Sequence, residues 1–405
     1  MPEDSETVLT PSPRHVDSGL EKPEEKIPDR ETLELPSEPL KRFEKSPVLL
    51  FWEMTAACPL LCLHCRASSL YTRSPSELGT VEAMVMLDTI ASFEPAPPTV
   101  VFTGGDPLMR DDLFELLDYS RALGIRTAVS PAVSEMLSQD TLRALRDLDV
   151  TSISVSLDGS TRQLHDEIRG VQGTYDMTLA AVRTALALGL KVQVNSVVMS
   201  RNFQDLPHLF HLVKSLGVPV WELFFIIVTG RAYSALNLDA PKFEEAARFA
   251  IEASRRIGAM RVVEAPFTRR LLYSSTGQSR HGAEPEISDV LVKIEGETSR
   301  EPSLPRRGTL DGDGTMFVSR NGDIYPGGLL PVKLGNVRNT NLVKVYSRNK
   351  LLRKIRSRSF TGPCGTCAYR FVCGGSRARS YAHSGSPLGS DPACIYGQSA
   401  EFSVA

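Results

Sequence analysis

Residues 175–198 read YDMTLAAVRTALALGLKVQVNSVV, and this stretch decides the fold. Its first part, up to Leu188, has the apolar spacing of an amphipathic helix. Gly189 provides the stop signal of that helix, and Val192 and Val194 then begin an apolar strand. A helix that runs directly into a strand is typical of a parallel sheet, because parallel neighbours need a crossover connection.

The same alternation extends outward over residues 47–228 and predicts six βα repeats, which place the chain in the α/β class with a parallel sheet. Expected strands are Leu49–Met54, Thr99–Thr103, Arg126–Ser130, Thr151–Ser156, Lys191–Val198 and Val220–Val228. Expected helices are Val81–Phe93, Asp112–Leu123, Ser138–Asp147, Tyr175–Leu188, Phe203–Leu216 and Pro241–Ile257. In a curved or closed α/β sheet, the chemistry lies at the C-terminal ends of the strands.

Outside this core the composition changes three times. Residues 1–45 are expected to form a disordered acidic leader, because residues 1–40 hold eleven Asp and Glu, four Lys and Arg, and seven prolines. Residues 46–270 form the core, and residues 271–307, with little periodicity, are expected to be a flexible insert. Residues 308–405 are expected to be a smaller unit, with a hairpin at Phe317–Tyr325 around an Asn-Gly turn.

Composition excludes several classes of protein. The formal net charge of -2 over 405 residues argues against a general nucleic-acid binder. Apolar runs such as Val48–Trp52 are far shorter than the roughly 18 residues of a membrane span. The N-terminus lacks the basic and apolar segments of a secretion signal, so we expect a cytoplasmic protein whose cysteines are reduced.

Three cysteines directly follow the first expected strand, in the segment Cys58-Pro-Leu-Leu-Cys62-Leu-His-Cys65. Soft thiolates at this spacing favour an iron–sulfur or zinc site over hard cations. Three thiolates would leave one corner of a cluster open for a ligand. The alternative is a zinc site that takes His64 as its fourth ligand.

The spacing and position of these cysteines resemble the signature of the radical S-adenosylmethionine (SAM) superfamily. The resemblance implies a [4Fe-4S] cluster on Cys58, Cys62 and Cys65, with SAM chelated to the fourth iron. It also implies a partial (β/α)6 TIM-like barrel and cleavage of SAM to a 5'-deoxyadenosyl radical, which abstracts hydrogen from a substrate. In this reading, His64 packs near the adenine.

Further residues match SAM contacts of the same family. The resemblance implies that the segment Gly104-Gly105-Asp106-Pro107, after the second strand, receives the methionine amino group, with Asp in place of the usual Glu. Ser156, at the end of the fourth strand, matches a contact to the ribose or carboxylate. Asn195, Arg169 and Ser130 are weaker matches, and for Asn195 and Arg169 a structural hydrogen bond or surface ion pair is equally compatible.

The four remaining cysteines form a second group near the C-terminus: Cys364, Cys367, Cys373 and Cys394. Four thiolates suit a fully ligated metal centre, and zinc is the alternative to iron–sulfur. The segment resembles the SPASM or twitch extension of radical SAM enzymes, most closely in the haem and haem d1 biosynthesis branch. That resemblance implies a second [4Fe-4S] cluster in a C-terminal extension.

The segment Lys344–Arg379 carries ten Lys and Arg and no Asp or Glu. Cations near a thiolate-ligated cluster ease its reduction and attract carboxylate-bearing substrates. We expect Arg377 and Arg379 near the cluster or the substrate, with ordinary ion pairing as the alternative.

The sequence therefore predicts a radical SAM enzyme of oxidoreductase or lyase type, with a carboxylate-rich tetrapyrrole as its substrate. Its electron donor would be a low-potential protein such as ferredoxin or flavodoxin, and neither nucleic acid nor membrane is an expected partner. Alternatives are a ribosomal peptide maturase and a non-enzymatic iron–sulfur electron carrier. Four residues are chemically able to handle the substrate proton or hydrogen atom: Tyr325, Tyr381, Asp158 and His383. The sequence does not select one of them.

Overall fold

The computed structural model describes residues 35–39, 41–274 and 300–398. Most of the predicted leader and most of the predicted insert lie outside these residues. Residues Lys41–Phe43 form a 3-10 turn ahead of the predicted core, and Phe43 is buried. Its backbone oxygen accepts a hydrogen bond from the Tyr346 hydroxyl, so this turn is tied to the C-terminal part of the chain.

One sheet connects the described strands in the order β11-β10-β9-β1-β2-β3-β4-β5-β6-β7, with β8 paired to β9. Strands β1 to β7 run parallel in sequence order, and β9 is parallel to β1 on its other side. The strands are β1 Leu49–Glu53, β2 Thr99–Thr103, β3 Thr127–Val129, β4 Ser152–Ser156, β5 Val192–Val198, β6 Val220–Phe225, β7 Ala259–Val263, β8 Leu310–Asp311, β9 Gly314–Val318, β10 Asp323–Tyr325 and β11 Gly335–Asn336.

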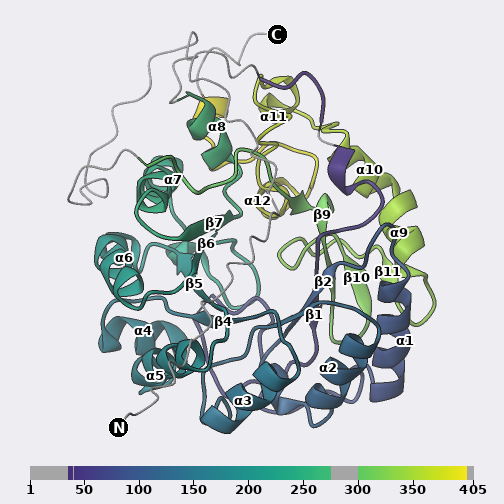
Figure 1. Cartoon of the computed structure of the whole chain (residues 1–405). Coiled ribbons are helices and arrows are strands. Elements are labelled where there is room, and N and C mark those ends of the chain that lie inside the picture. The colour runs from purple at the N-terminus through teal and green to yellow at the C-terminus, as the bar shows by residue number, and fades with distance from the viewer. Residues whose placement is uncertain (1–34, 40, 275–299, 399–405) are drawn as a thin grey trace, which may run out of the picture. The chain divides into compact units, whose positions relative to one another are not determined.

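Helices α1 to α7 lie around the outer side of the curved sheet, and α9 and α10 continue this ring beside β9 to β11 (Figure 1). This arrangement is the predicted α/β class with a partial barrel. The helices are α1 Thr80–Ala91, α2 Leu113–Ala122, α3 Gln139–Asp147, α4 Arg162–Arg169, α5 Thr174–Ala187, α6 Leu206–Ser215, α7 Ala240–Ser254, α8 Phe267–Tyr273, α9 Leu342–Arg348, α10 Lys350–Arg356, α11 Pro363–Thr366 and α12 Arg377–Ser384.

The core lies between the sheet and this ring of helices. Trp52 of β1 is fully buried, and its ring centroid is 5.4 Å from that of Phe102 on β2. Farther round the sheet, Trp221 packs between Phe210 of α6 and Phe249 of α7. Each large apolar side chain buried in this way contributes about 1.5–3 kcal/mol, so alternate residues of each strand fix the sheet against the helices.

The intervening strand residues face the interior of the barrel and are more polar. On β4 to β7 they include Ser156, Asn195, Glu222 and Arg261, three of them half-buried and Arg261 exposed. Register places Ser156 opposite Asn195 and Glu222 opposite Arg261. Because paired residues share a face of a sheet, these side chains line one polar interior wall.

The structure corrects the predicted strands in several places, two of them in the core. The strand expected at Val220–Val228 ends at Phe225, and β7 was not predicted. In β7 only Met260 is fully buried and Arg261 is exposed, so its sequence lacks a strong strand pattern. The hairpin at Phe317–Tyr325 is confirmed, with β9 and β10 antiparallel and Gly322 at a φ of 81° in the turn.

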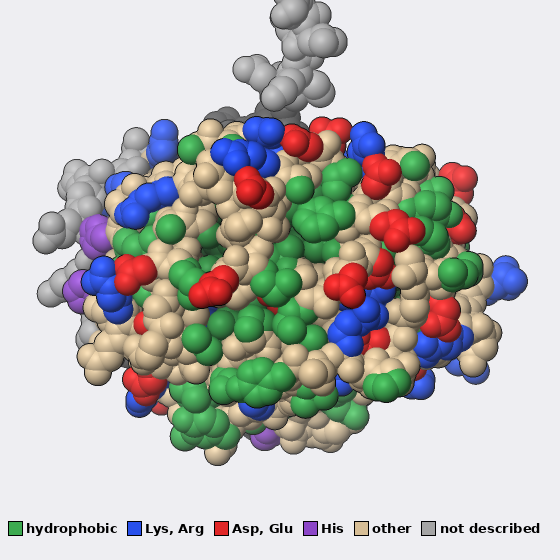
Figure 2. Space-filling model, turned by 90° about the horizontal axis from the view of Figure 1, so that it is seen from below, with side chains coloured by type: hydrophobic (Ala, Val, Ile, Leu, Met, Phe, Trp, Pro, Cys, Tyr) green, Lys and Arg blue, Asp and Glu red, His purple; other side chains and the backbone are tan. Residues whose placement is uncertain are grey.

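The surface carries charge of both signs. On the face seen from below in Figure 2, acidic and basic side chains are interspersed with separate small apolar groups. Among the described helices, none has the length and apolar character needed to span a membrane.

Candidate metal centres

The loop after β1 holds the first three cysteines in an interior position. Cys58 and Cys62 are buried, and Cys65 is half-buried. The backbone N–H groups of Leu61 and Leu63 donate to the carbonyl oxygens of Arg169 and Ile168, at the end of α4. The loop is therefore fixed between β1 and α4, and its thiols lie at the C-terminal end of the sheet.

Polar groups surround the three sulfur atoms. The Leu60 N–H donates to Cys58 Sγ at 3.4 Å, and Arg169 Nη1 donates to Cys62 Sγ at 3.6 Å. Burial, followed by the neighbouring Cys62 thiol, raises the pKa of Cys58 to about 12. A bound metal overcomes such a shift by coordinating the thiolate, and the N–H donors then share the added negative charge.

Arg169 connects the cysteine loop to Asp158. Its Nη2 lies 2.5 Å from Asp158 Oδ2, and both side chains are almost fully buried. Although burial opposes it, the Arg169 charge, followed by His64, holds the pKa of Asp158 below its usual range. Burial lowers the pKa of His64 to about 4, so this imidazole is neutral. Its Nε2 faces Asp158 at 4.0 Å.

The segment Gly104–Pro107 packs against the same loop. The Gly105 N–H donates to the Thr55 oxygen at 2.8 Å, and the Asp106 N–H donates to the Ala57 oxygen at 2.6 Å. A Cβ atom on Gly105 would lie 2.2 Å from the Ala57 oxygen, so only glycine permits this approach. The two segments predicted to share one ligand are therefore in direct contact.

Asp106 has a buried acceptor without a hydrogen-bond partner. Its Oδ1 accepts from the N–H groups of Leu108 and Ala132, whereas Oδ2 is buried and makes no hydrogen bond to the described residues. Burial raises the pKa of Asp106 to about 6, and the hydrogen bonds from the N–H groups of Leu108 and Ala132 oppose the shift only in part. An unpaired buried carboxylate oxygen is costly, and an ammonium group from a ligand would satisfy it.

The other predicted SAM contacts lie on adjacent strands. Ser156 and Asn195 are cross-strand neighbours on β4 and β5, at the C-terminal side of the sheet. Asn195 Oδ1 accepts a hydrogen bond from Gln193 Nε2 at 2.7 Å. Ser130 follows β3, where its N–H donates to the Phe102 oxygen. Arg169 contacts Cys62 and Asp158, as described above.

The four C-terminal cysteines also gather in one region. Cys364 lies in α11, Cys367 follows it, and Cys373 and Cys394 lie in the loops on either side of α12. Burial raises the pKa of Cys373 well above its usual value, and the thiols of Cys394, Cys364 and Cys367 raise it further. Cys364 Sγ and Cys373 Sγ both lie beside Gly375, so these two thiols are near neighbours.

Backbone amides point at these sulfur atoms as well. The Tyr369 N–H donates to Cys367 Sγ, and the Gly375 N–H donates to Cys373 Sγ, both at 3.4 Å. Arg377 Nη2 lies 3.9 Å from Cys364 Sγ. In both groups, therefore, donors are already arranged to stabilise thiolates.

The distances between possible ligand side chains can be compared with the needs of a zinc site. Across residues 35–39, 41–274 and 300–398, no three His, Cys, Asp or Glu side chains are close enough to hold one metal ion. A four-iron cluster differs from a zinc site in that each thiolate binds its own iron. All seven cysteines are free of disulfides, so both groups retain the donors that a cluster needs.

Known proteins resemble this chain over most of its length. Residues 52–213 match the model of the radical SAM superfamily. AdoMet-dependent heme synthases from Oleidesulfovibrio alaskensis and Methanosarcina barkeri are 33% and 32% identical to it, over 86% and 87% of this chain and 87% and 97% of theirs. Streptococcus suis SuiB bound to precursor peptide SuiA has a TM-score of 0.63 and 18% identity, covering 86% of this chain and 75% of SuiB.

This chain belongs to the radical SAM superfamily. The family implies one [4Fe-4S] cluster and SAM as cofactors, and the three-cysteine loop with the free Asp106 oxygen fits that pair. The predicted resemblance to the haem biosynthesis branch is confirmed by the heme synthases. Radical SAM membership also makes this protein an enzyme.

The two arginines singled out from the sequence differ in their surroundings in this radical SAM protein. Arg377 lies beside the Cys364 thiol and is otherwise held by the oxygens of Pro387 and Gly389. Arg379 forms an ion pair with both carboxylate oxygens of Asp391 at 3.2 Å. Arg377 is therefore the residue next to the second group of thiols, whereas Arg379 is in an internal ion pair.

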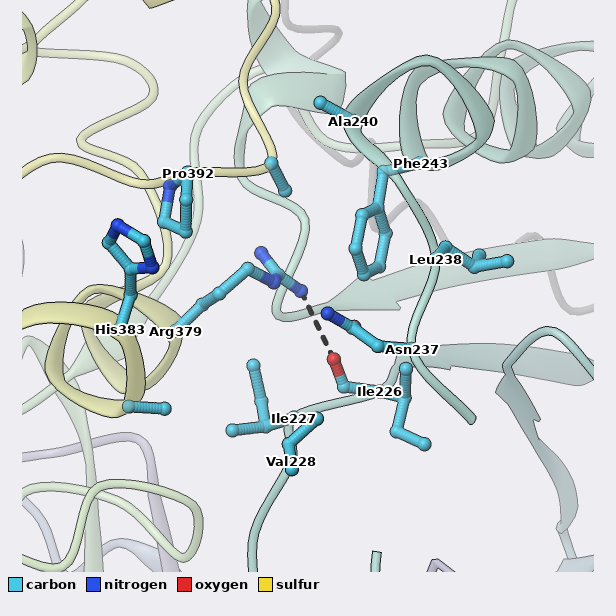
Figure 3. Close-up of a pocket in the computed structure, with 12 residues that line it drawn as sticks. Ile226, Ile227, Val228, Asn237, Leu238, Ala240, Phe243, Arg379, His383 and Pro392 are labelled. Atoms are coloured by element: carbon cyan, nitrogen blue, oxygen red, sulfur yellow. Dashed lines mark hydrogen bonds between the residues drawn. The ribbon is translucent and has the colours of Figure 1, made fainter. Parts of the chain in front are cut away.

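Figure 3 shows a cavity of about 230 Å³ beside Arg379. Apolar side chains from the loop after β6 and from the N-terminal end of α7 form most of its wall, and the Arg379 guanidinium stacks on Phe243 at 4.4 Å. His383 of α12 lines the same cavity.

The other three candidates for handling the substrate proton have different environments. Tyr325 lines a second cavity at the interior face of β1 and β9. Asp158 is paired with Arg169, and Tyr381 packs against an apolar cluster of Ile227, Leu330 and Ala378. Tyr325 is therefore the candidate that faces a cavity inside the barrel of this radical SAM enzyme.

Several polar residues of the site were not predicted. Glu264, after β7, accepts a hydrogen bond from the Ser376 hydroxyl, and Ser376 N–H donates to Asp391. Glu53, at the end of β1, is buried with two arginines around it. The available sequence signal for Glu53 was an acidic residue at the end of a strand. The partner of Glu264, Ser376, is 112 positions away and gives no local sequence signal.

Proposed function

We propose that this radical SAM enzyme acts on a carboxylate-rich tetrapyrrole in a haem-type biosynthetic reaction. The observation that supports this most strongly is the extent of similarity to the heme synthases. It covers 86% of the chain and so reaches well beyond residues 52–213, which carry the general radical SAM pattern. The basic segment 344–379 is consistent with an anionic substrate.

The residues of this chain have distinct roles in the proposal. Cys58, Cys62 and Cys65 hold the cluster, and Asp106 Oδ2 accepts the amino group of SAM. Ser156 and Asn195 bind the remaining polar groups of SAM from the adjacent strands. When bound, the cluster and SAM supply the 5'-deoxyadenosyl radical that removes hydrogen from the substrate. The partial barrel keeps water away from that radical.

We further propose that Cys364, Cys367, Cys373 and Cys394 hold a second [4Fe-4S] cluster, in a SPASM or twitch type extension over residues 308–405. Two thiols accept backbone N–H donors, and Arg377 lies beside a third. Positive charge and N–H donors ease reduction of a cluster. A low-potential ferredoxin or flavodoxin would deliver electrons in the cytoplasm, where the seven free thiols stay reduced.

Anaerobic reconstitution tests the enzyme part of the proposal. With dithionite and SAM, the protein should release 5'-deoxyadenosine, and coproporphyrin III carrying iron should increase that release and change in mass. A reducible, cluster-loaded protein that releases no 5'-deoxyadenosine would refute the proposal. If 5'-deoxyadenosine is released but the porphyrin has no effect, the tetrapyrrole is refuted as the substrate, whereas the radical SAM chemistry is retained.

Iron counting tests the second cluster. Two clusters require about eight iron atoms per chain. Cys62→Ala and Cys367→Ala should each retain about four, from different clusters. If the wild type binds only about four iron atoms and both variants lose them equally, the second cluster is excluded.

The peptide maturase alternative has weaker support. SuiB is only 18% identical to this chain, so the likeness shows a shared fold and carries no argument about substrate. An electron carrier would not need the unpaired Asp106 oxygen beside an open three-thiolate site. The tetrapyrrole proposal is therefore retained.

A further inference from the structure

A cavity of about 210 Å³ opens at the interior face of β1, β9 and β10. Its wall includes Glu53 at the end of β1, Phe317 on β9 and Tyr325 on β10. The cavity is smaller than the roughly 300–1,000 Å³ of pockets that enclose a whole drug-sized ligand. It suits one arm of a larger molecule better than a complete tetrapyrrole.

Two arginines in this wall share one carboxylate. Arg66 Nη2 and Arg320 Nη1 each lie 3.3 Å from Glu53 Oε1. Glu53 is 2% exposed, whereas the two arginine side chains are 26% and 28% exposed. Two cations against one buried anion leave an excess of one positive charge at the cavity wall.

The remaining charges around the cavity do not cancel this excess. Asp323 also lines the wall, but it is paired with Lys333 at 2.7 Å. Within the described residues, the side chains of Arg66 and Arg320 have no other hydrogen-bond or ion-pair partner besides Glu53. Each guanidinium carries five N–H donors, so donors remain on both for an anion that enters the cavity.

The guanidinium groups are held in place before any ligand binds. Arg66 stacks on the Phe317 ring, with its Cζ 4.4 Å from the ring centroid. The Arg320 backbone N–H points at Glu53 Oε2 at 3.5 Å, and its oxygen accepts from the Leu78 N–H. A prearranged pair of arginines binds carboxylate at lower entropic cost than free side chains.

The cavity lies beside the loop that carries the first three cysteines. Arg66 directly follows Cys65, and Thr229 also lines the cavity. Two residues after Thr229, the Arg231 N–H donates to the Cys65 oxygen at 3.0 Å. A group held by Arg66 is therefore close to the loop that carries the first three cysteines.

We propose that Arg66 and Arg320 form the binding site for one carboxylate of the substrate, with Glu53 as the residue that positions both guanidinium groups. The inference rests on the proposed function, since it names the group by which that substrate is recognised. Charge-assisted hydrogen bonds to a desolvated carboxylate are roughly twice as strong as hydrogen bonds between neutral groups. Loss of one arginine should therefore weaken binding about tenfold or more.

Binding of metal-free coproporphyrin III, a tetracarboxylate, and of its tetramethyl ester tests the proposal on the cluster-loaded protein. Porphyrin fluorescence anisotropy gives both dissociation constants. Arg320→Gln and Arg66→Gln should each weaken binding of the acid about tenfold and leave binding of the ester unchanged. Arg320→Lys, which keeps the charge, should retain part of the affinity. Arg183→Gln, at an exposed arginine of α5 outside the basic segment, is the matched control and should bind both probes as the wild type does.

Two results would overturn the inference: unchanged acid affinity in both Gln variants, or equal loss of acid and ester affinity in variants with normal iron content. If a Gln variant does not fold, the acid-to-ester ratio of Arg320→Lys decides. Release of 5'-deoxyadenosine by the wild type is measured in parallel. If the wild type releases no 5'-deoxyadenosine, the proposed function is refuted. If it does release 5'-deoxyadenosine and the arginine variants bind the acid as the wild type does, only the carboxylate site is refuted.

Discussion

Asp106 combines burial, an unpaired oxygen and a position next to the three-cysteine loop. Its Oδ2 has no hydrogen-bond donor among the described residues. In a folded chain such an atom is unfavourable by about 1–3 kcal/mol. A ligand ammonium group removes that penalty, so this single atom couples SAM binding to the stability of the site.

Asp106→Asn should weaken SAM binding about tenfold or more, because the amide keeps the shape of the side chain but removes its charge. Equilibrium dialysis with the reconstituted protein measures the dissociation constant. Asp140→Asn, at an exposed position of α3, is the control and should have no effect. Wild-type affinity in Asp106→Asn would show that the carboxylate does not contact SAM.

Glu222 is a second interior carboxyl with an altered pKa. Burial raises its pKa to about 7, and Arg261 and the hydrogen bond from Gln193 oppose the shift only in part. Its ordinary pKa is 4.5. Between these two values the folded state binds more protons than the unfolded state, so stability decreases as pH rises through this range.

Glu222→Gln should therefore raise the melting temperature relative to the wild type, by about 2 °C more near pH 8.5 than near pH 6. Thermal unfolding of the reconstituted protein followed by circular dichroism measures this difference. A difference that is the same at both pH values would contradict the raised pKa of Glu222.

At the scale of elements, helix α4 positions the cysteine loop through its C-terminal end. Gly170 caps this helix with a φ of 71°, and Leu61 of the cysteine loop packs directly on it. A Cβ at Gly170 would lie 2.5 Å from the Leu61 oxygen. Helix α5 ends at a similar glycine, Gly189, with a φ of 79° but with open space around it.

A comparison of alanine substitutions at these two glycines distinguishes the effect of backbone strain from the effect of moving the cysteine loop. Gly189→Ala should lower the free energy of unfolding by about 1 kcal/mol, from strain alone, and retain full iron. Gly170→Ala should lose, in addition, about half of the iron of a two-cluster protein, because the Cys62 loop must move. Iron analysis and chemical denaturation measure the two effects. Equal iron content in both variants would show that α4 does not position the loop.

At the scale of the whole molecule, the C-terminal segment completes the sheet of the core. Strand β9 pairs with β1 over four residues, from Leu49 with Thr315 to Trp52 with Val318. The boundary predicted at residue 308 thus lies between strands of one continuous sheet. An unpaired β1 would expose an apolar edge strand, which promotes aggregation.

A chain ending at residue 307 should therefore aggregate, whereas a chain that starts at residue 35 and keeps the C-terminus should stay soluble and bind iron. Size-exclusion chromatography and iron analysis compare the two. A soluble fragment 35–307 that holds about four iron atoms would show that the core folds without β9.

The sequence alone determined the α/β alternation, the division of the seven cysteines into three and four, and the segment Gly104–Pro107, because these are patterns of short spacing. Other elements escaped it, among them β7, with one fully buried residue, and α4, whose sequence RQLHDEIR contains few apolar residues. Both depend on neighbours in the fold, which local periodicity does not report.

The tertiary structure alone decided which polar groups meet. Arg66 and Arg320 lie 13 and 267 positions from Glu53, yet all three share one cavity. It also decided that Asp106 keeps a free oxygen while Arg379 has a partner in Asp391. The cysteine spacing predicts a metal centre because the donor residues are close together in the chain. A carboxylate site needs burial and long-range contacts, which exist only after the sheet has closed around it.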